Sequence, residues 1–178
     1  SLPSELQKKL SFREGDVRSL NLNKSFSSVI SLFHVLSYQT RDSDVEAMIE
    51  TASKHLQPSG PFIFDFWFRP AVLKQKPELR VKRMSNDRFE ITRIAEPTPH
   101  SLPDTIDVNY QVFIKDKTTS ELTEIRETHS MRCFELDYLE SILERHQLKI
   151  THSGEWLTNK TPNEDTWGVY IVACKSSS

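Results

Sequence analysis

The hydrophobic pattern of the first half of the chain predicts strands around one helix. Residues 10–17 (LSFREGDV) alternate apolar and polar side chains, and residues 26–33 (FSSVISLF) form a short β-branched apolar run, so both are expected to be strands. Residues 45–56 carry apolar side chains at helical spacing, and Asp42, Ser43 or Asp44 precedes them as the expected N-cap. PFIFDFWF, residues 61–68, is apolar on both faces, which is typical of a strand inside a parallel sheet. This order predicts a βαβ unit and an α/β sheet.

The second half has a different pattern. Between residues 80 and 134, four runs of alternating apolar and polar residues are separated by polar turns, which predicts an inserted antiparallel sheet. Ala95–Asp104 contains three prolines and is expected to be an exposed loop. Residues 135–148 predict an amphipathic helix, and two strands are expected to close the chain.

We therefore expect three parts. They are a first α/β part, an inserted β region, and a closing helix with a β-hairpin, over residues 1–79, 80–134 and 135–178. The opening residues 1–10 contain helix formers and fit the end of a helix.

Composition narrows the class of protein. A chain of 178 residues suits one domain, and 37% hydrophobic with 10% aromatic residues is enough for a packed core. The net charge of -2 from 23 basic and 25 acidic residues gives no field that would attract nucleic acid, and no apolar run is long enough to cross a membrane. Cys133 and Cys174 lack the spacing of a metal site and are expected to be buried thiols. We expect a cytoplasmic protein that binds neither nucleic acid, membrane nor metal.

Several motifs in this order resemble one known family. FREGDVRSL, FSSVISLFHVLSYQT, a helix and HLQPSGPFIFDFW are similar to the middle motifs of class I S-adenosylmethionine-dependent methyltransferases. ETHSMRCFELDYLESIL, the pair Glu155-Trp156 and TWGVYIVACK resemble the end of the same domain, so the resemblance covers essentially the whole chain. It implies a Rossmann-like methyltransferase sheet with an antiparallel insertion, S-adenosylmethionine as cofactor and a small molecule as methyl acceptor.

The resemblance also implies positions for the cofactor. In such enzymes an acidic residue in the Gly-Asp turn lies near the adenine amino group, and the end of the next strand lies against the cofactor. These two places correspond here to Gly15, Asp16, Val17, Leu32, Phe33 and His34. Two alternatives stay open: the Gly-Asp pair as an ordinary turn, and His34 as a partly exposed histidine at the start of a helix.

Methyl transfer from a sulfonium depends mainly on positioning, and it needs a base only if the nucleophile must lose a proton. His34 and His129 are candidate bases by residue type, since imidazole titrates at about pH 6.5. Aromatic walls with one cation suit a small polar metabolite that has an acidic group, and the candidates for such a pocket are Tyr38, Gln39, Arg132, Trp156 and Trp167. The resemblance also implies that Asp65 and Trp67, at the end of residues 61–68, face the substrate crevice. Strand packing and ordinary core or surface histidines would give the same sequence signals.

The chain departs from the family pattern in two places. Phe26-Ser27 stands where an acid commonly follows the phenylalanine, and this is a minor feature. More importantly, the first strand, its glycine loop and the acid that binds the ribose all belong before Ser1 in such enzymes, and the four glycines of this chain cannot form that loop. We therefore expect a truncated chain whose exposed strand edges favour a homodimer.

Three functions remain open from the sequence. The first is a methyltransferase that is active in its full-length form. The second is a catalytically inactive, methyltransferase-like binding or regulatory protein. The third is an unrelated α/β nucleotide-binding module, which would require a phosphate loop that this sequence does not contain.

Overall fold

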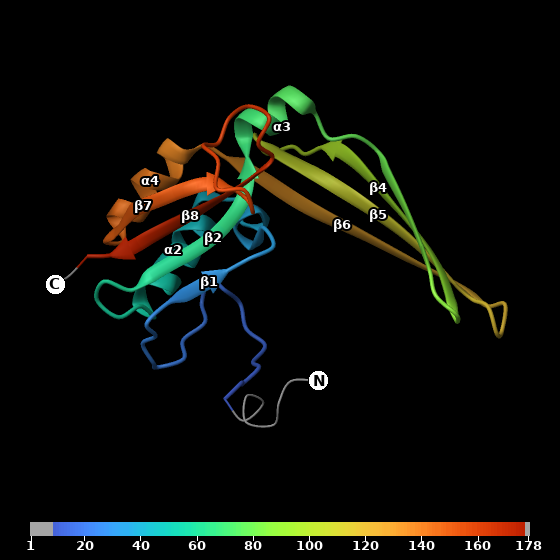
Figure 1. Cartoon of the computed structure of the whole chain (residues 1–178), viewed down its shortest axis with the longest axis horizontal. Helices are drawn as coiled ribbons and strands as arrows, with labels where there is room; N and C mark the ends of the chain where they lie inside the picture. Colours follow the sequence, from blue (N-terminus) through green and yellow to red (C-terminus); the bar gives the residue numbers. More distant parts are fainter. Residues whose placement is uncertain (1–8, 177–178) are drawn as a thin grey trace.

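The protein is a mixed sheet with helices on one face and a long antiparallel arm (Figure 1). The computed structural model describes residues 9–176, so the helix expected over residues 1–10 lies almost entirely outside the described residues. The elements run in the order β1 (Val29–Ser31), the 3-10 helix η1 (Val35–Tyr38), α2 (Asp42–Lys54), β2 (Pro61–Phe68), α3 (Arg69–Gln75), β3 (Arg80–Ser85), β4 (Phe89–Pro99), β5 (Thr105–Asp116), β6 (Leu122–Phe134), α4 (Leu136–Arg145), β7 (Leu148–Glu155) and β8 (Gly168–Lys175). The strand order is β3-β4-β5-β6-β2-β8-β7, and β1 pairs with β2.

The expected βαβ unit is present. β1 and β2 are parallel, with Val29 opposite Phe62 and Ser31 opposite Phe64, and α2 connects them. The side chains of Phe62, Phe64 and Phe66 are fully buried in the main core. Each buried side chain of this size contributes about 1.5–3 kcal/mol relative to an exposed one, so β2 is the centre of the core.

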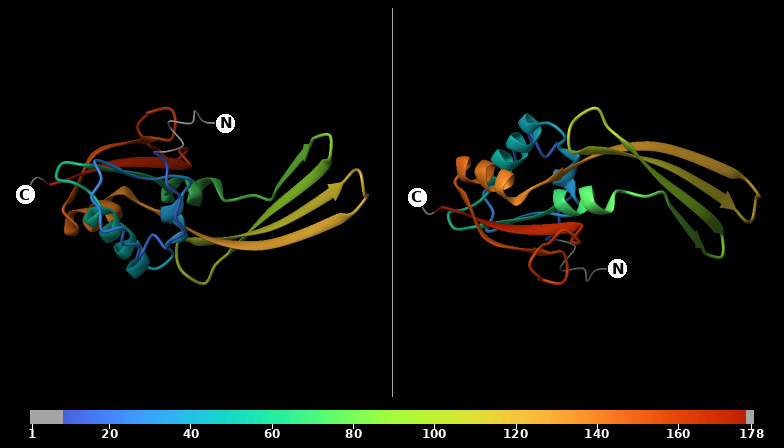
Figure 2. Two further views of the ribbon diagram at one scale, coloured as in Figure 1. Left: turned by 90° about the horizontal axis from the view of Figure 1, so that it is seen from below. Right: turned by 90° about the horizontal axis from the view of Figure 1, so that it is seen from above.

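Both long helices cover the same face of the sheet, and the site lies on the other. The phenylalanines of β2 point toward α2 and α4, which Figures 1 and 2 show together behind the strands. Because side chains alternate along a strand, Ile63, Asp65 and Trp67 point to the opposite face. Neither helix covers this second face.

The antiparallel insertion is also present and extends away from the body as the arm, β3 to β6 (Figure 2). The arm joins the body where β6 runs parallel to β2, with Trp67 opposite Cys133 and Phe68 opposite Phe134. At this junction Ala95, Val108 and Met131 form a small second core against Trp67. We call this side of the arm its inner face, and it continues the uncovered face of the body.

One expected strand is not formed. Residues 11–16 have no regular secondary structure, and residues 17–19 are a turn. A strand requires a hydrogen-bonded neighbour, and none of the described strands lies beside this segment. The next expected strand, residues 26–33, is reduced to Val29–Ser31, because Phe26 makes only an isolated bridge to Leu56 and the chain turns sharply at Phe33.

The proline-rich stretch is partly strand rather than loop. β4 continues through Pro97 to Pro99, paired with β5. β3 pairs with β4 only as far as Ala95, so one edge of β4 is free beyond that residue. The prolines lack a backbone N–H, but at a free edge this costs no hydrogen bond between strands.

The helix boundaries differ from expectation at three places. α2 begins at Asp42 with Arg41 as its N-cap, because the carboxylate of Asp42 instead accepts hydrogen bonds from Arg132 and Tyr138. The short helix α3 was not predicted, and α4 covers only Leu136–Arg145.

Cys133, at the junction of arm and body, makes stability sensitive to alkaline pH. Burial, with a smaller effect from Asp104, raises the pKa of its thiol from 9.0 to about 11. Because the unfolded thiol ionises first, this contribution to stability is complete below pH 9 and is lost as the pH rises to about 11. Between these pH values the free energy of unfolding should fall less in Cys133→Ala than in the parent, by up to about 2 kcal/mol. Urea unfolding across this pH range measures the difference. The half-buried Cys174→Ala is the control, and an unchanged pH dependence in Cys133→Ala would contradict the assignment.

Candidate active site

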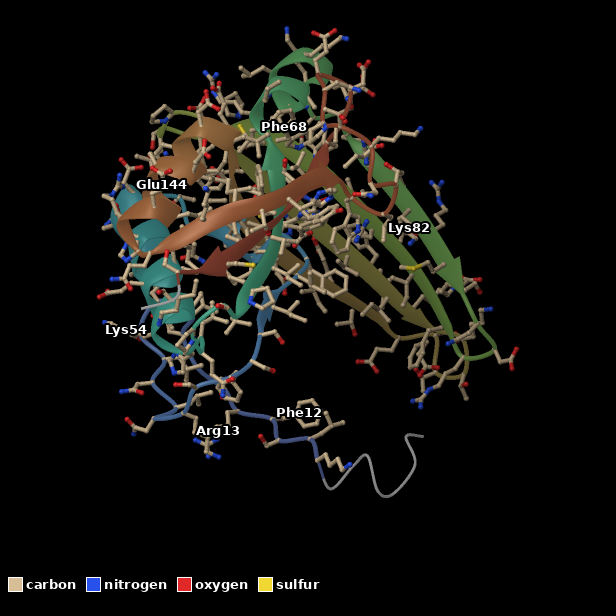
Figure 3. All side chains as sticks on the ribbon, turned by 60° about the vertical axis from the view of Figure 1, so that its left-hand side comes forward. Phe12, Arg13, Lys54, Phe68, Lys82 and Glu144 are labelled. Carbon is tan, nitrogen blue, oxygen red and sulfur yellow. The ribbon has the colours of Figure 1, made fainter. Side chains whose placement is uncertain are left out.

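The candidate site lies on the uncovered face, where the carboxyl ends of β1 and β2 meet the base of the arm. Carboxyl ends of parallel strands lie at the same edge of a sheet, and ligands of open α/β sheets bind there. Phe68, labelled in Figure 3, marks this end of β2. The chain that leaves β1 therefore passes directly beside the last residues of β2.

A strained turn connects β1 to η1 and depends on one buried carboxylate. Phe33 and His34 have φ values of 67° and 60°, a left-handed conformation that costs a residue other than glycine about 1–2 kcal/mol. The backbone N–H of His34 donates to Oδ1 of Asp65 at 3.0 Å, and Nδ1 of His34 lies 3.0 Å from Oδ2. This second contact lacks hydrogen-bonding geometry. Asp65 is only 1% exposed, so its carboxylate holds the turn from inside the sheet.

Aromatic side chains surround this histidine. The ring of His34 meets Trp67 edge-on at 6.4 Å between centroids, and Trp67 meets Trp167 in the same way at 5.3 Å. A Cβ placed on Gly168 would lie 3.6 Å from Cε1 of His34 and 3.5 Å from Cβ of Trp156. The structure thus brings five of the predicted residues into one cluster: His34, Asp65, Trp67, Trp156 and Trp167.

A second group, Tyr38, His129 and Glu127, links the body to the arm. The hydroxyl of Tyr38 lies 2.7 Å from Nδ1 of His129, and Nε2 of His129 lies 3.1 Å from Oε2 of Glu127. Since the carboxylate can only accept, Nε2 carries the proton and Nδ1 accepts from the phenol. Burial, followed by the nearby Tyr110 and Glu127, raises the pKa of Tyr38, so its phenol is neutral near pH 7. Tyr38, His129 and Glu127 thus form one chain of hydrogen bonds from η1 to the arm.

Glu127 was not predicted from the sequence. Glu127 and His129 are two residues apart in β6 and therefore lie on the same face of the strand. That spacing was the available signal. It became informative only when the structure placed Tyr38 opposite the histidine.

Two further residues predicted for the acceptor pocket, Gln39 and Arg132, lie outside the aromatic cluster. Gln39 is buried and donates from Nε2 to the carbonyl oxygen of Val35. Arg132 donates to Asp42 at 2.7 Å, and its guanidinium lies over the rings of Phe134 and Tyr138. The contacts of Arg132 connect β6 to α2 and α4, and they lie away from the aromatic cluster.

The residues predicted for the adenine side are only partly together. The carboxylate of Asp16, in the turn after Gly15, receives the backbone N–H and the guanidinium of Arg18, and these hydrogen bonds lower its pKa to about 2. Val17 and Leu32 line an apolar cavity of about 460 Å³ that follows β1. Among the described strands β1 has β2 as its one neighbour, so this cavity borders an unpaired strand edge.

Comparison with known proteins identifies the fold. No model of a protein family matches the sequence. A dTDP-3-amino-3,4,6-trideoxy-alpha-D-glucopyranose N,N-dimethyltransferase from Streptomyces venezuelae is 30% identical over 57 residues, which are 32% of this chain and 24% of that protein. The chain thus spans about a quarter of the curated relative that it matches.

Solved structures match over nearly the whole chain. An S-adenosylmethionine-dependent methyltransferase from Clostridium acetobutylicum ATCC 824 has a TM-score of 0.80 at 20% identity, over 96% of this chain and 68% of that one. An amino pentose methyltransferase from Micromonospora echinaspora, solved with S-adenosylmethionine bound, has a TM-score of 0.67 at 16% identity, over 89% and 62%. This chain has the fold of class I S-adenosylmethionine-dependent methyltransferases.

None of the helices over residues 9–176 is long and apolar enough to cross a membrane.

Proposed function

We propose that this chain forms the acceptor side, and part of the cofactor side, of an S-adenosylmethionine-dependent methyltransferase that acts on an amine of a small, sugar-like molecule. The observation that carries the proposal is the relay of Tyr38, His129 and Glu127 beside the cluster of His34, Asp65 and Trp67, at the ligand-binding edge of this fold. The names of the Streptomyces and Micromonospora relatives, both aminosugar methyltransferases, support the acceptor class. In this proposal residues 80–134 are the acceptor-binding insertion.

The described residues suit the adenine end of the cofactor but leave its ribose without a carboxylate. Phe33 is an exposed aromatic ring at the end of β1, and it suits stacking against adenine. The carboxylates of Asp16 and Asp65 are already held by Arg18 and His34, so neither is free to bind a ribose diol. We infer that a further segment of the polypeptide, outside these 178 residues, pairs with β1, fills the apolar cavity and supplies the glycine loop. The unpaired edge of β1 and the 68% and 62% coverage of the solved relatives support this inference.

When bound, S-adenosylmethionine supplies an electrophilic methyl group. An acceptor amine that arrives as an ammonium must first lose a proton, and the oxygen of Tyr38 takes it while the phenol passes its own proton to Nδ1 of His129. The carboxylate of Glu127 stabilises the resulting imidazolium through Nε2–H. Trp67 and Trp167 form an apolar wall that excludes water from the crevice.

Calorimetry with S-adenosylmethionine tests this function on two forms of the protein, the 178-residue chain and the full-length polypeptide. We expect micromolar binding, and methyl transfer to an amino sugar, only in the full-length form. Binding without transfer to any amine would favour the inactive regulatory alternative. Absence of binding by the full-length form would reject a role for the cofactor.

Phe33 provides a more specific test of the cofactor side. It is 84% exposed with a φ of 67°, so glycine at this position relieves strain and removes little packing. We expect Phe33→Gly to leave the free energy of unfolding unchanged, or to raise it by up to about 1 kcal/mol, while weakening S-adenosylmethionine binding about tenfold. Urea unfolding and calorimetry measure the two effects. A destabilised variant with unchanged affinity would make Phe33 a structural residue.

Two broader expectations complete the proposal. A cytoplasmic location is supported by the free thiols of Cys133 and Cys174. A homodimer is supported by the arm, whose apolar residues Met84 and Ile125 lie on the same face and are each at least 40% exposed. We propose that the arm of a second copy covers them, because the positive charges of β3 oppose pairing through its edge. A monomeric sedimentation coefficient at micromolar concentration would reject the dimer.

A further inference from the structure

Three cations lie together on the inner face of the arm. In the register of β3 and β4, Lys82 is directly opposite Arg93, and Arg80 is opposite Ala95, so Arg80 is the diagonal neighbour of Arg93 on the same face. Like charges placed directly opposite each other destabilise a sheet. Over residues 9–176 no ion pair of these three side chains is found, whereas Arg69, Arg88 and Arg126 each contact a carboxylate. The arrangement therefore carries an electrostatic cost that no ion pair within residues 9–176 offsets.

The two arginines line a pocket with an aromatic wall. Arg80 and Arg93 border a cavity of about 150 Å³ together with Trp67, Trp167 and Tyr110. The guanidinium of Arg93 lies 5.4 Å from the centre of the Tyr110 ring, which holds it beside the cavity. The one carboxylate among the lining residues is the exposed Glu78, so positive charge exceeds negative charge at the pocket. The cavity is large enough for an anionic group, but not for a whole metabolite.

This pocket adjoins the proposed relay. Tyr110 touches Arg93 on one side and meets the ring of His129 edge-on at 5.1 Å on the other. Trp67 likewise belongs to both the pocket and the His34 cluster. A molecule anchored at the arginines would therefore extend along Tyr110 toward Tyr38.

We propose that Arg80, Arg93 and Lys82 form a subsite for a phosphate or diphosphate group of the methyl acceptor. This inference rests on the proposed function and deepens it by assigning the acceptor to phosphorylated molecules. Guanidinium groups bind phosphate oxygens through paired charge-assisted hydrogen bonds, and a multiply charged anion neutralises several cations at once, which a single carboxylate does not. Anchoring this group holds the amine of the acceptor at the relay while its phosphate remains at the arm.

Titration with inorganic pyrophosphate tests the subsite without cofactor or acceptor. We expect the protein to bind pyrophosphate more tightly than acetate, with an affinity that falls as salt is raised. The double variant Arg80→Gln, Arg93→Gln should bind about tenfold more weakly or worse, because it loses the charge-assisted hydrogen bonds of both guanidinium groups. The matched control is Arg83→Gln, which changes the same charge on the same strand but on the outer face, and it should retain affinity within about twofold.

Thermal unfolding gives a second, independent readout. Without anion, Arg93→Gln should unfold at the same or a higher temperature than the parent, because the repulsion with Lys82 is removed. Pyrophosphate should raise the unfolding temperature of the parent and of Arg83→Gln, but not that of the double variant Arg80→Gln, Arg93→Gln. Equal pyrophosphate binding by the double variant, or an equal loss in Arg83→Gln, would overturn the subsite. If the full-length protein binds S-adenosylmethionine but the parent does not bind millimolar pyrophosphate, the subsite fails while the methyltransferase proposal stands.

Discussion

Replacing Tyr38 by phenylalanine, or His129 by alanine, is expected to lower kcat of the full-length enzyme by about 10²–10⁴, the usual contribution of a positioned acid or base. Either change interrupts the path from acceptor to imidazole, since the phenol lies 2.7 Å from Nδ1. The double variant should be no slower than the worse single variant, because both residues act in one relay. Glu127→Gln should have a smaller effect, because its amide still orients the ring but does not stabilise the imidazolium. Transfer of labelled methyl from S-adenosylmethionine measures kcat and KM.

A matched control separates the relay from a general effect of removing a histidine. His152, on β7, makes comparable contacts with Tyr170 on β8 and with Asn159 in the loop between the two strands, and His152→Ala should leave kcat within about twofold. Calorimetric affinity for S-adenosylmethionine should also be unchanged in Tyr38→Phe, because the phenol is assigned to the acceptor. The relay is wrong if Tyr38→Phe keeps the parent kcat, or if only KM changes.

Asp65→Ala is expected to lower the free energy of unfolding by about 2–3 kcal/mol and to reduce methyl transfer at least about a hundredfold. The buried carboxylate accepts a hydrogen bond from the backbone N–H of His34 and lies 3.0 Å from Nδ1 of its imidazole, so alanine leaves that N–H without its partner and removes the carboxylate beside the ring. The left-handed turn at Phe33 and His34 then has nothing to hold it, and Phe33 loses its position at the end of β1. Urea unfolding measures the first effect, and transfer of labelled methyl from S-adenosylmethionine measures the second.

Asp65→Asn distinguishes the two roles of the carboxylate. The asparagine oxygen can still accept from the backbone of His34, so most of the stability should return. The charge beside Nδ1 is absent, so any requirement for it appears as reduced activity in a stable protein. Asp87→Ala, at the exposed tip of the arm, controls for loss of a carboxylate and should change neither quantity. A fully active Asp65→Ala variant would remove Asp65 from the site.

The strands of the insertion were predictable because their signal is local. β5 and β6 alternate apolar and polar residues, and they match two of the four predicted runs, DTIDVNYQVFIKD and ELTEIRETHSMRCF, to within one residue. β2 was predicted at its observed limits for a similar reason, since the turn at Gly60 precedes a run that is apolar on both faces. The resemblance to methyltransferases, carried by the same motifs, correctly predicted the fold that the solved relatives share.

Other expectations failed where the local signal competes with distant partners. Residues 10–17 alternate like a strand, but alternation alone provides no hydrogen-bonded neighbour. Asp42 has the residue type of an N-cap, yet its carboxylate binds Arg132, 90 residues along the chain. Pro97 and Pro99 suggested a loop, but they occupy a strand edge that is free because β3 is short.

The sequence by itself determined the two long helices, the strands of the insertion, the α/β class and the central buried strand, because side-chain period and turn residues act over a few neighbours. The tertiary structure decided which side chains meet. Tyr38 and His129 are 91 residues apart, and Arg80 and Arg93 share a pocket because of the register between β3 and β4. A shift of one residue in that register would move a whole row of side chains to the other face, and the pairing that fixes it is a property of the folded sheet.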